Sequence, residues 1–465
     1  MFPDIELIML LTAASCGTYS TIYQPFLFHK ECHLRYAHRR DVSRICCNLD
    51  NSQDESVLGH VQRDVAFAGE YLNLCSLIPA TMAAILIGAW SDKNGRKLPV
   101  LVALLGFILH YVIFMAFASF PDYVGTVGLV LVTTALGFTG TSLVVLAACF
   151  SAISDCTQDA KVLGLRIGLA CGCVRIGYVL GCVAAGFLVR FGYNYVFLVG
   201  EIFLVIAFGL VVCCFQDQNL DEKPGDSCAG TCLGIFDCQY IQDTLTTLIQ
   251  PRTGSRRLFM ILALISFIIL YSTDVGASVT CLFLKHPPFQ WSDAGFGYWR
   301  ACNQASAAGG MLLMTLVAKR WLAFADCTLL LWGLVVTVAK EILLSNAEDD
   351  LSIFLVCPLS GLASIAYPCF ISFISKQTSK EEAGKIFCII LSAEFISPIL
   401  SVLLYNNVYA ATVAIDPGFV YSLGAAALTL AIIIMRLPAL SFCISGDQDK
   451  LSQGNLVYFP FTVSA

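Results

Sequence analysis

Long apolar runs separated by short polar stretches dominate this chain and restrict what it can fold into. Hydrophobic residues make up 57% and charged residues 13% of the 465 residues, whereas a soluble domain carries about a quarter charged residues. An apolar run of about 18 residues or more can cross a bilayer as a helix. The sequence therefore predicts an all-α membrane protein, and this composition excludes a soluble enzyme.

Twelve apolar segments are predicted to be transmembrane helices, in two groups of six separated by a polar stretch. Their spans are 5–28, 66–90, 98–118, 124–152, 166–189, 194–215, 258–284, 294–318, 324–345, 351–374, 385–408 and 415–437. The predicted domains are a six-helix half at 1–215 with an outer loop at 29–65, a central cytosolic loop at 216–257, a second six-helix half at 258–437, and a cytosolic tail at 438–465.

The orientation follows from Lys and Arg, which accumulate in cytosolic loops. Short loops on one side of the predicted membrane carry Lys93, Arg96, Lys97, Lys319 and Arg320, whereas the short loops on the other side are poor in cations. Both termini are therefore predicted to lie in the cytosol. The loop 29–65 also carries cations, but long loops count less in this rule.

The stretch 88–97, Gly-Ala-Trp-Ser-Asp-Lys-Asn-Gly-Arg-Lys, lies between two apolar runs. It resembles the loop between the second and third helices of major facilitator transporters. We expect Arg96 to pair with Asp155 and hold the cytosolic side shut; the alternative is a topology anchor of hydrated charges. The residues of this gate motif are Gly88, Asp92, Gly95, Arg96, Lys97 and Asp155.

Further stretches, including Tyr71-Leu72-Asn73-Leu74 and Pro417-Gly418-Phe419, extend the resemblance over nearly the whole chain. Together they resemble the proton-coupled folate transporter family (solute carrier family 46), and most of all its lysosomal catabolite carrier branch. This resemblance implies the major facilitator fold, with twelve helices in two six-helix halves. It also implies secondary active transport by alternating access, of folates or of peptide-like catabolites, usually with protons as the coupling ion.

The chain departs from that family at two positions that bear on function. Relatives carry an acid in the segment 166–189 soon after an arginine, whereas here Arg166 is followed by Cys171. Relatives also have a cysteine in the loop after the seventh helix, and Phe289-Gln290-Trp291 lacks it. The first departure puts proton coupling through this helix in doubt, and the second removes an expected cross-link to the outer loop.

Among the charged residues within predicted helices, four lie in segments that line the central cavity of the resembled fold: Arg175, Asp274, Arg300 and Glu394. A charge inside a membrane is costly, so such residues usually face a cavity or a partner. We expect the two arginines to bind an anionic group of the substrate. The two acids are candidates to carry protons, because burial favours the neutral carboxyl. The alternative is that the four form fixed salt bridges.

Most of the 22 cysteines lie in apolar runs, where cysteine behaves as a small hydrophobic residue. Cys32, Cys46 and Cys47 lie in the outer loop, where one disulfide among them is expected; their pairing stays open. Neither a metal site nor a cofactor is predicted. The expected partners are a small organic anion and the lipid bilayer, not nucleic acid, and the oligomeric state stays open.

Two functions from different classes remain. The first is proton-coupled secondary transport of a small organic anion, folate-like or peptide-like. The second is a transporter-derived receptor or scaffold that no longer moves solute, which Cys171 favours slightly. An enzyme is not expected, because no nucleophile, His and acid arrangement is present. The plasma membrane and the lysosomal membrane are both consistent with the sequence.

Overall fold

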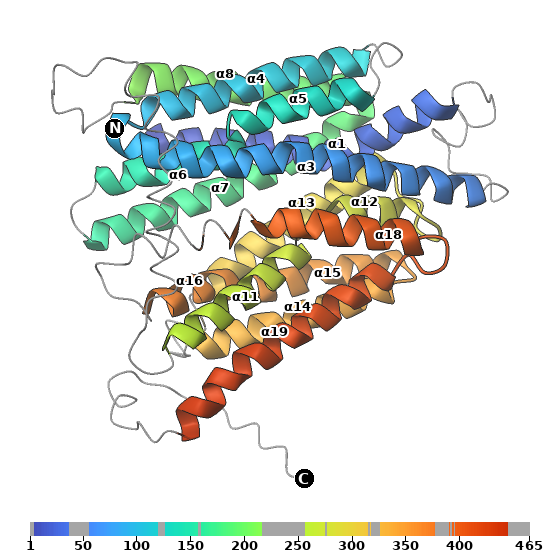
Figure 1. The fold of residues 1–465 in the computed structure, drawn as a ribbon. Helices are drawn as coiled ribbons and strands as arrows, with labels where there is room; N and C mark the ends of the chain where they lie inside the picture. Colours follow the sequence, from blue (N-terminus) through green and yellow to red (C-terminus); the bar gives the residue numbers. More distant parts are fainter. Residues whose placement is uncertain are drawn as a thin grey trace, which may run out of the picture. The chain divides into compact units, whose positions relative to one another are not determined.

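The computed structural model consists of helices throughout the residues that it describes (Figure 1). No strand occurs within those residues. They are 4–36, 55–119, 126–156, 160–215, 256–274, 277–314, 317, 326–376, 390, 393–394 and 396–444.

Helices occupy all six segments that are predicted in the first part of the chain. They are α1 (Asp4–Tyr36), α3 (Glu55–Asn94), α4 (Lys97–Ser119), α5 (Thr126–Phe138), α6 (Thr141–Asp155), α7 (Ala160–Leu188), the short η1 (Val189–Phe191) and α8 (Tyr193–Cys214). The fourth predicted segment is interrupted between α5 and α6. Gly140 has a φ of 84° and Thr141 a φ of 56°, and this left-handed turn suits glycine because it lacks a Cβ.

The second part of the chain is also helical in each predicted segment, but a turn at 364–365 interrupts the tenth segment and the eleventh contains a π-helix. The elements are α11 (Arg256–Asp274), α12 (Ala277–Lys285), α13 (Asp293–Met314), α14 (Asp326–Ser345), α15 (Asp350–Ala363), α16 (Ala366–Lys376), the π-helix η5 (Val402–Asn406), α18 (Asn407–Thr412) and α19 (Phe419–Ile444). Among the described residues, 8 helical stretches are long and apolar enough to cross a membrane.

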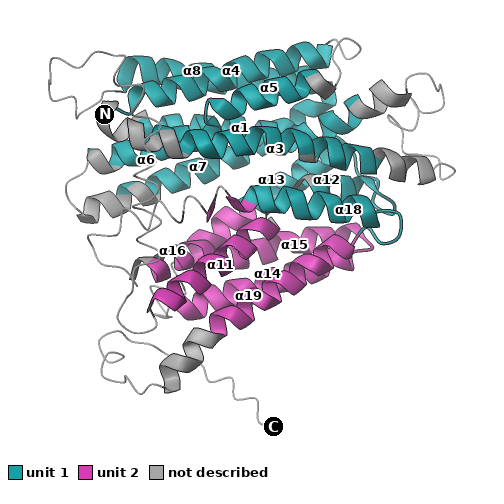
Figure 2. Ribbon diagram, viewed as in Figure 1, with its two compact units in different colours: residues 1–240, 275–305, 398–417 teal, residues 241–274, 306–397, 418–465 magenta. Residues whose placement is uncertain are grey.

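The chain forms two compact units (Figure 2), and the first comprises Met1–Tyr240, Val275–Ala305 and Pro398–Pro417. Within it α1 packs on α7 and α8, and α3 packs on α5, α12 and α18. Gly177 and Gly181 lie where α7 meets α1. A Cβ at either position would collide with a backbone carbonyl of α1, at Leu10 or Ala14, so these glycines permit the close approach.

The second unit comprises Ile241–Asp274, Ser306–Ser397 and Gly418–Ala465. Here α14 packs against α15, α16 and α19, and α11 packs against α16 and α19. Phe267, Leu330 and Phe370 are fully buried in its apolar core. Because the first unit contains parts of the seventh, eighth and eleventh predicted segments, the units follow packing rather than chain order. The predicted domain boundaries stay predictions.

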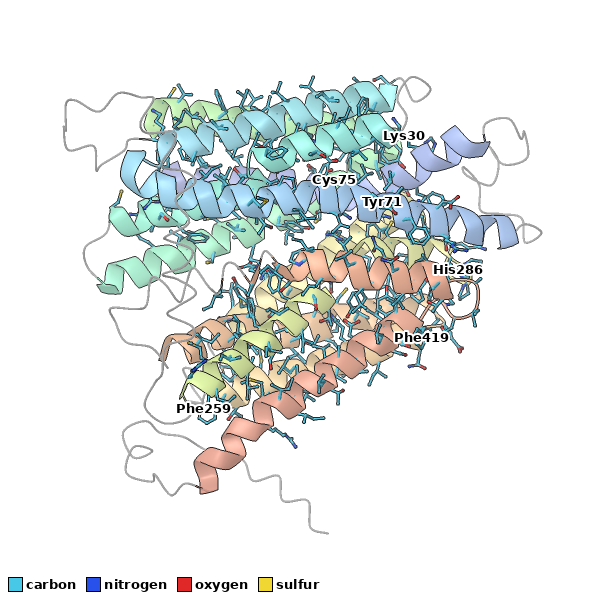
Figure 3. All side chains as sticks on the ribbon, in the orientation of Figure 1. Lys30, Tyr71, Cys75, Phe259, His286 and Phe419 are labelled. Carbon is cyan, nitrogen blue, oxygen red and sulfur yellow. The ribbon has the colours of Figure 1, made fainter. Side chains whose placement is uncertain are left out.

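Many large apolar side chains point outward from the helices (Figure 3), as expected for surfaces that face lipid. Leu131 is 67% exposed, and Tyr71, which projects from α3, is 63% exposed. Water would make exposed apolar surface on this scale unfavourable, whereas lipid does not. The described helices therefore have the surface of an integral membrane protein.

Candidate substrate site

Arg300 lies on α13 within the first unit, and its buried side chain contacts α7. Its Nη2 donates a hydrogen bond of 2.9 Å to the Tyr178 hydroxyl. That hydroxyl is hydrogen-bonded in turn to Ser20 Oγ on α1, at 2.5 Å. Gly297, one turn before Arg300, lies against the backbone of Gly186 on α7. Two glycines facing each other bring the helices close enough for this contact.

The charge of Arg300 has no carboxylate partner among the described residues. The side chain is only 9% exposed, and its buried Nε has no hydrogen-bond partner. Its guanidinium carbon lies 6.0 Å from the centre of the Phe296 ring. A buried charge without a counter-charge is strongly destabilising. The arrangement is therefore suited to receive an anionic group from outside the chain.

Arg175 lies on α7 three residues before Tyr178, so the two share a face of the helix. The side chain is half-buried. Within the described part of the chain, no side chain pairs with it. By contrast, the buried cations Arg166 and Lys285 each contact a carboxylate. Arg175 and Arg300 thus differ from the structural cations in leaving their charge available.

Glu394 belongs to the second unit, where two tyrosines donate hydrogen bonds to its carboxylate. The Tyr271 hydroxyl on α11 donates to Oε1 at 2.7 Å, and the Tyr367 hydroxyl on α16 donates to Oε2 at 3.1 Å. The Tyr271 ring stacks on Phe267 at 5.4 Å. Among the described residues, this carboxylate is held by neutral donors and not by a cation. Asp274 ends α11, and its side chain lies outside the described residues.

The gate motif lies at the junction of α3 and α4. Gly95 adopts a φ of 98°, which makes the turn between them. Lys97 Nζ donates a 2.9 Å hydrogen bond to the carbonyl of Val212, near the end of α8. Gly88 and Asp92 lie in the last turns of α3 and Asp155 ends α6, but the side chains of Asp92 and Asp155 are not described. The pairing of Arg96 with Asp155 stays a prediction.

The predicted disulfide falls outside what the structure describes. Cys46 and Cys47 lie beyond the described residues, and Cys32 lies in α1 with an undescribed side chain. Cys173 of α7 is among the free cysteines. No group of metal-binding side chains occurs in the described ranges.

The sequence analysis missed an ion pair between Glu6 and Arg166. Arg166 Nη2 lies 3.2 Å from Glu6 Oε1, and the side chains are 8% and 5% exposed. Glu6 comes from the first turns of α1, whereas Arg166 comes from α7. The signal in the sequence was an acid at the start of an apolar run, but its partner is 160 positions away.

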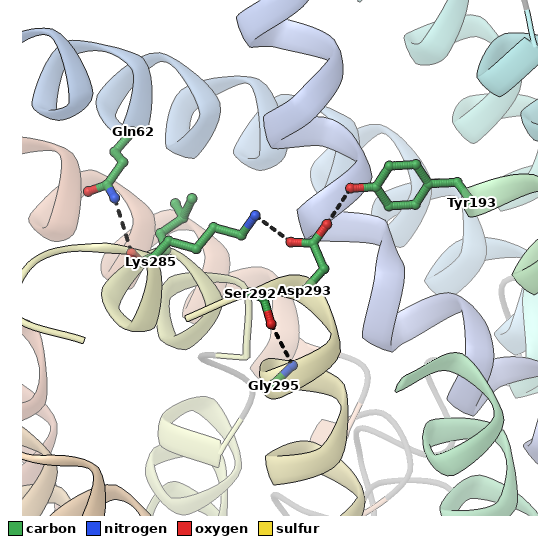
Figure 4. A network of polar contacts seen from close by, with 7 residues as sticks. Gln62, Tyr193, Lys285, Ser292, Asp293 and Gly295 are labelled. Carbon is green, nitrogen blue, oxygen red and sulfur yellow. Dashed lines mark hydrogen bonds and ion pairs between the residues drawn. The ribbon is translucent and has the colours of Figure 1, made fainter. Parts of the chain in front are cut away.

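It also missed a polar network around Asp293 (Figure 4). The carboxylate pairs with Lys285 Nζ at 2.5 Å and accepts a 2.5 Å hydrogen bond from the Tyr193 hydroxyl. Both charged groups lie just outside the predicted spanning segments. Burial alone would raise the pKa of Asp293, but the Lys285 charge and the two hydrogen bonds outweigh it and hold that pKa below its usual range. Burial lowers the pKa of Lys285, yet Asp293 raises it above its usual value overall.

The broken helices, the lipid-facing surface and the unpaired arginines define a membrane carrier with polar groups inside its helices. The sequence profile of the Major Facilitator Superfamily matches residues 56–402. The chain therefore belongs to the Major Facilitator Superfamily, whose members transport solutes. This membership also excludes the enzyme class.

Two relatives support the resemblance to solute carrier family 46. The lysosomal proton-coupled steroid conjugate and bile acid symporter of Homo sapiens is 24% identical over 389 residues, covering 83% of this chain and 80% of that protein. The proton-coupled folate transporter of Rattus norvegicus is 22% identical over 396 residues, covering 83% of this chain and 82% of that protein.

Solved structures agree with the fold. The human organic anion transporter MFSD10 (TETRAN) matches with a TM-score of 0.63 at 14% identity, covering 93% of this chain and 98% of that chain. The POT family transporter PepTSo matches with a TM-score of 0.65 at 13% identity, covering 95% of this chain and 98% of that chain. The predicted major facilitator fold is confirmed.

Proposed function

We propose that this transporter is a proton-coupled carrier of small organic anions, with Arg300 as the main anion-binding residue. The observation that carries the proposal is the buried Arg300 guanidinium, which has a tyrosine hydroxyl but no carboxylate partner in the described residues. Arg175, also unpaired, lies on the same helix as Tyr178 and is the second anion-binding candidate. A carboxylate or sulfate placed against Arg300 would supply its missing counter-charge.

The names of the relatives agree with this substrate class. Bile acids and folates both carry carboxylates, and steroid conjugates include sulfates and glucuronides. These are the substrates of the named relatives. For this chain the shared feature is an anionic group on a largely apolar or aromatic body. The lysosomal relatives also favour the lysosomal membrane over the plasma membrane.

Protons are the proposed coupling ion, and Glu394 is their proposed carrier. Its carboxylate is held only by the Tyr271 and Tyr367 hydroxyls among the described residues, so no fixed cation keeps it ionised. Proton uptake by such a group changes its charge without breaking an ion pair. Asp274 remains the second candidate from the sequence.

The test is uptake into cells that place the protein at their surface, at about pH 5.5 and about pH 7.4, a range in which proton-coupled carriers change activity. The labelled probes are folate, a bile acid, a sulfated steroid and a peptide fragment. We expect uptake of at least one anionic probe to be higher at acid pH. Arg300→Gln is expected to raise the half-saturating concentration by about tenfold or more, because a hydrogen bond to a charged group is lost.

The matched control is Arg190→Gln. Arg190 is exposed and lies 5.2 Å over the Tyr298 ring, so its loss should leave uptake nearly unchanged. Uptake that ignores pH would contradict proton coupling. If no probe is transported by protein shown to be at the surface, the receptor or scaffold alternative is favoured instead.

A further inference from the structure

A short connection joins the end of α12 to the start of α13, and charged residues stand at both of its ends. Lys285 is the last residue of α12, and Asp293 is the first residue of α13. The backbone N–H of Trp291 donates to the Leu284 carbonyl at 2.9 Å, which closes the connection on itself. The predicted topology places this connection on the outer side of the membrane.

The two oxygens of Asp293 are divided between different parts of the fold (Figure 4). Oδ1 pairs with Lys285, across the same connection. Oδ2 accepts the hydrogen bond from Tyr193, the first residue of α8. Lys285 Nζ also lies 4.7 Å from the centre of the Phe28 ring on α1. The connection between the seventh and eighth segments is thus fastened to α8 and α1 of the first six-helix half.

Gln62 on α3 makes a second set of hydrogen bonds at this end of the helices. Its Nε2 donates to the Leu282 carbonyl of α12 at 3.2 Å, and its Oε1 accepts a hydrogen bond of 3.2 Å from the Tyr409 hydroxyl of α18. Asn406 Nδ2 adds a 3.4 Å hydrogen bond to the Ala66 carbonyl. Gln62 and Tyr409 are fully buried, so these bonds are shielded from water.

We propose that these contacts are the outer gate of the transport cycle. The Tyr193–Asp293 bond and the Gln62 bonds break each time the outer side opens, whereas the Lys285–Asp293 pair stays intact. Asp293 and Tyr193 are the gate residues, and Lys285 is a positioning residue that holds the carboxylate in place. The inference rests on the proposed transport function, because a carrier must expose its site to each side in turn.

The two oxygens of Asp293 have different partners, which explains how such a gate can reopen. Breaking an ion pair while its charges stay buried is strongly unfavourable. The bond to Tyr193 is different, because its loss leaves Asp293 paired with Lys285 and leaves only a neutral hydroxyl to be hydrated. The gate is therefore firm enough to exclude water and weak enough to open in each cycle.

Acid by itself does not open this gate. The groups that face Asp293 are Lys285 from α12, Tyr193 from α8 and His29 from α1. The pKa of Asp293 lies below its usual range, so the carboxylate keeps its charge in mildly acidic solution. His29 adds to this effect, because its charge also lowers the pKa of Asp293. Opening must therefore come from the rest of the cycle and not from titration of Asp293.

Cys281 supplies a natural reporter. It is fully buried on α12, one turn before Lys285, and it becomes accessible when this end of the helices separates. The measurement is the rate at which Cys281 reacts with a membrane-impermeant maleimide added from outside. Labelling that remains in Cys281→Ser comes from other cysteines and is subtracted. The unmodified chain should react slowly. Tyr193→Phe should react about tenfold faster or more, since a bond to a charged acceptor is lost.

The matched control is Tyr195→Phe, which lies on the same helix and is 55% exposed; its labelling rate should not change. Gln62→Met provides a second variant of similar size and should also label faster. Unchanged labelling in both Tyr193→Phe and Gln62→Met would overturn the proposal, as would a Cys281 that reacts only from the cytosolic side. The labelling needs no substrate, so a failure of the proposed transport function would not be confused with a failure of the gate.

Discussion

Arg166 donates hydrogen bonds from both Nε and Nη2 to a single oxygen of Glu6, at 3.3 and 3.2 Å. The other oxygen of Glu6 is buried without a hydrogen-bond partner. Relatives place an acid soon after this arginine in the same helix, where this chain has Cys171. Here Glu6 on α1 supplies the acid instead. Arg166 on α7 therefore still has a carboxylate partner.

The first prediction concerns this pair. Glu6→Gln should lower the free energy of unfolding by about 3–5 kcal/mol, because it leaves Arg166 buried without its counter-charge. The double variant Glu6→Gln with Arg166→Gln should regain part of that loss. Thermal unfolding of the purified protein measures both. Arg63→Gln, at an exposed position, is the control and should cost less than about 1 kcal/mol.

The single variant Arg166→Gln completes the comparison. If the losses of unfolding free energy in Glu6→Gln and Arg166→Gln add up to the loss in the double variant, the two residues are not coupled and the prediction is wrong. The pH dependence of uptake supplies a separate readout. Because the pair is structural, Glu6→Gln should leave the shape of that profile unchanged while the amount of folded protein falls.

The second prediction concerns Glu394. The Tyr271 and Tyr367 hydroxyls hold its carboxylate in place by hydrogen bonds. Tyr271→Phe should slow uptake by about tenfold, because a hydrogen bond to a charged group is lost. Tyr367→Phe should slow it less, because its bond of 3.1 Å is longer than the 2.7 Å bond of Tyr271. Glu394→Gln should make uptake insensitive to pH.

Tyr71→Phe is the control for this series, since Tyr71 is exposed on α3. Uptake that keeps its pH dependence in Glu394→Gln would show that Glu394 does not carry the proton. In that case Asp274 would be the next residue to replace.

The third prediction concerns the pH dependence of the Lys285–Asp293 pair. The lowered pKa of Asp293 means that its contribution to stability is present above the usual Asp value and is lost only as pH falls through the still lower folded value. The raised pKa of Lys285 means that its contribution is present below the usual Lys value and is lost only as pH rises through the folded value. The pair should therefore be intact from about pH 4 to about pH 10.

Thermal unfolding at about pH 5, 6.5 and 8 tests this. The double variant Lys285→Met with Asp293→Asn should differ in melting temperature from the unmodified protein by the same margin at all three values, because neither residue of the native pair titrates in this range. His29→Gln in the same series separates any contribution of the neighbouring imidazole. A margin that disappears at the acid end would mean that Asp293 is protonated there and that acid does open the gate.

Helix positions followed from the sequence because the requirement for long apolar runs is local. All twelve predicted segments contain helix, and the turn at Gly95 lies where the gate motif predicted it. The break between α5 and α6 was missed, because Gly140 and its neighbours Thr139 and Thr141 are uncharged and lie within a long apolar run. Hydropathy measures apolar length, and a left-handed turn does not change that length.

The charged residues of the site were also only partly predictable from the sequence. Arg175, Arg300 and Glu394 could be selected from the sequence, because an ionisable residue in an apolar segment is conspicuous. Their contacts could not be predicted: Arg300 bonds to Tyr178 and Glu394 bonds to two tyrosines, and these partners are neutral and common residues. Asp293 and Lys285 were overlooked because charges beside a loop are ordinary.

The sequence by itself determined that this protein is a helical membrane protein of the major facilitator type, because bilayer thickness and backbone hydrogen bonding leave few other ways to satisfy such long apolar runs. Only the tertiary structure decided which charges are paired. Glu6 with Arg166, and Tyr193 with Asp293, are separated by 160 and 100 positions. Packing of helices, and not any local pattern, brings such residues within hydrogen-bond distance.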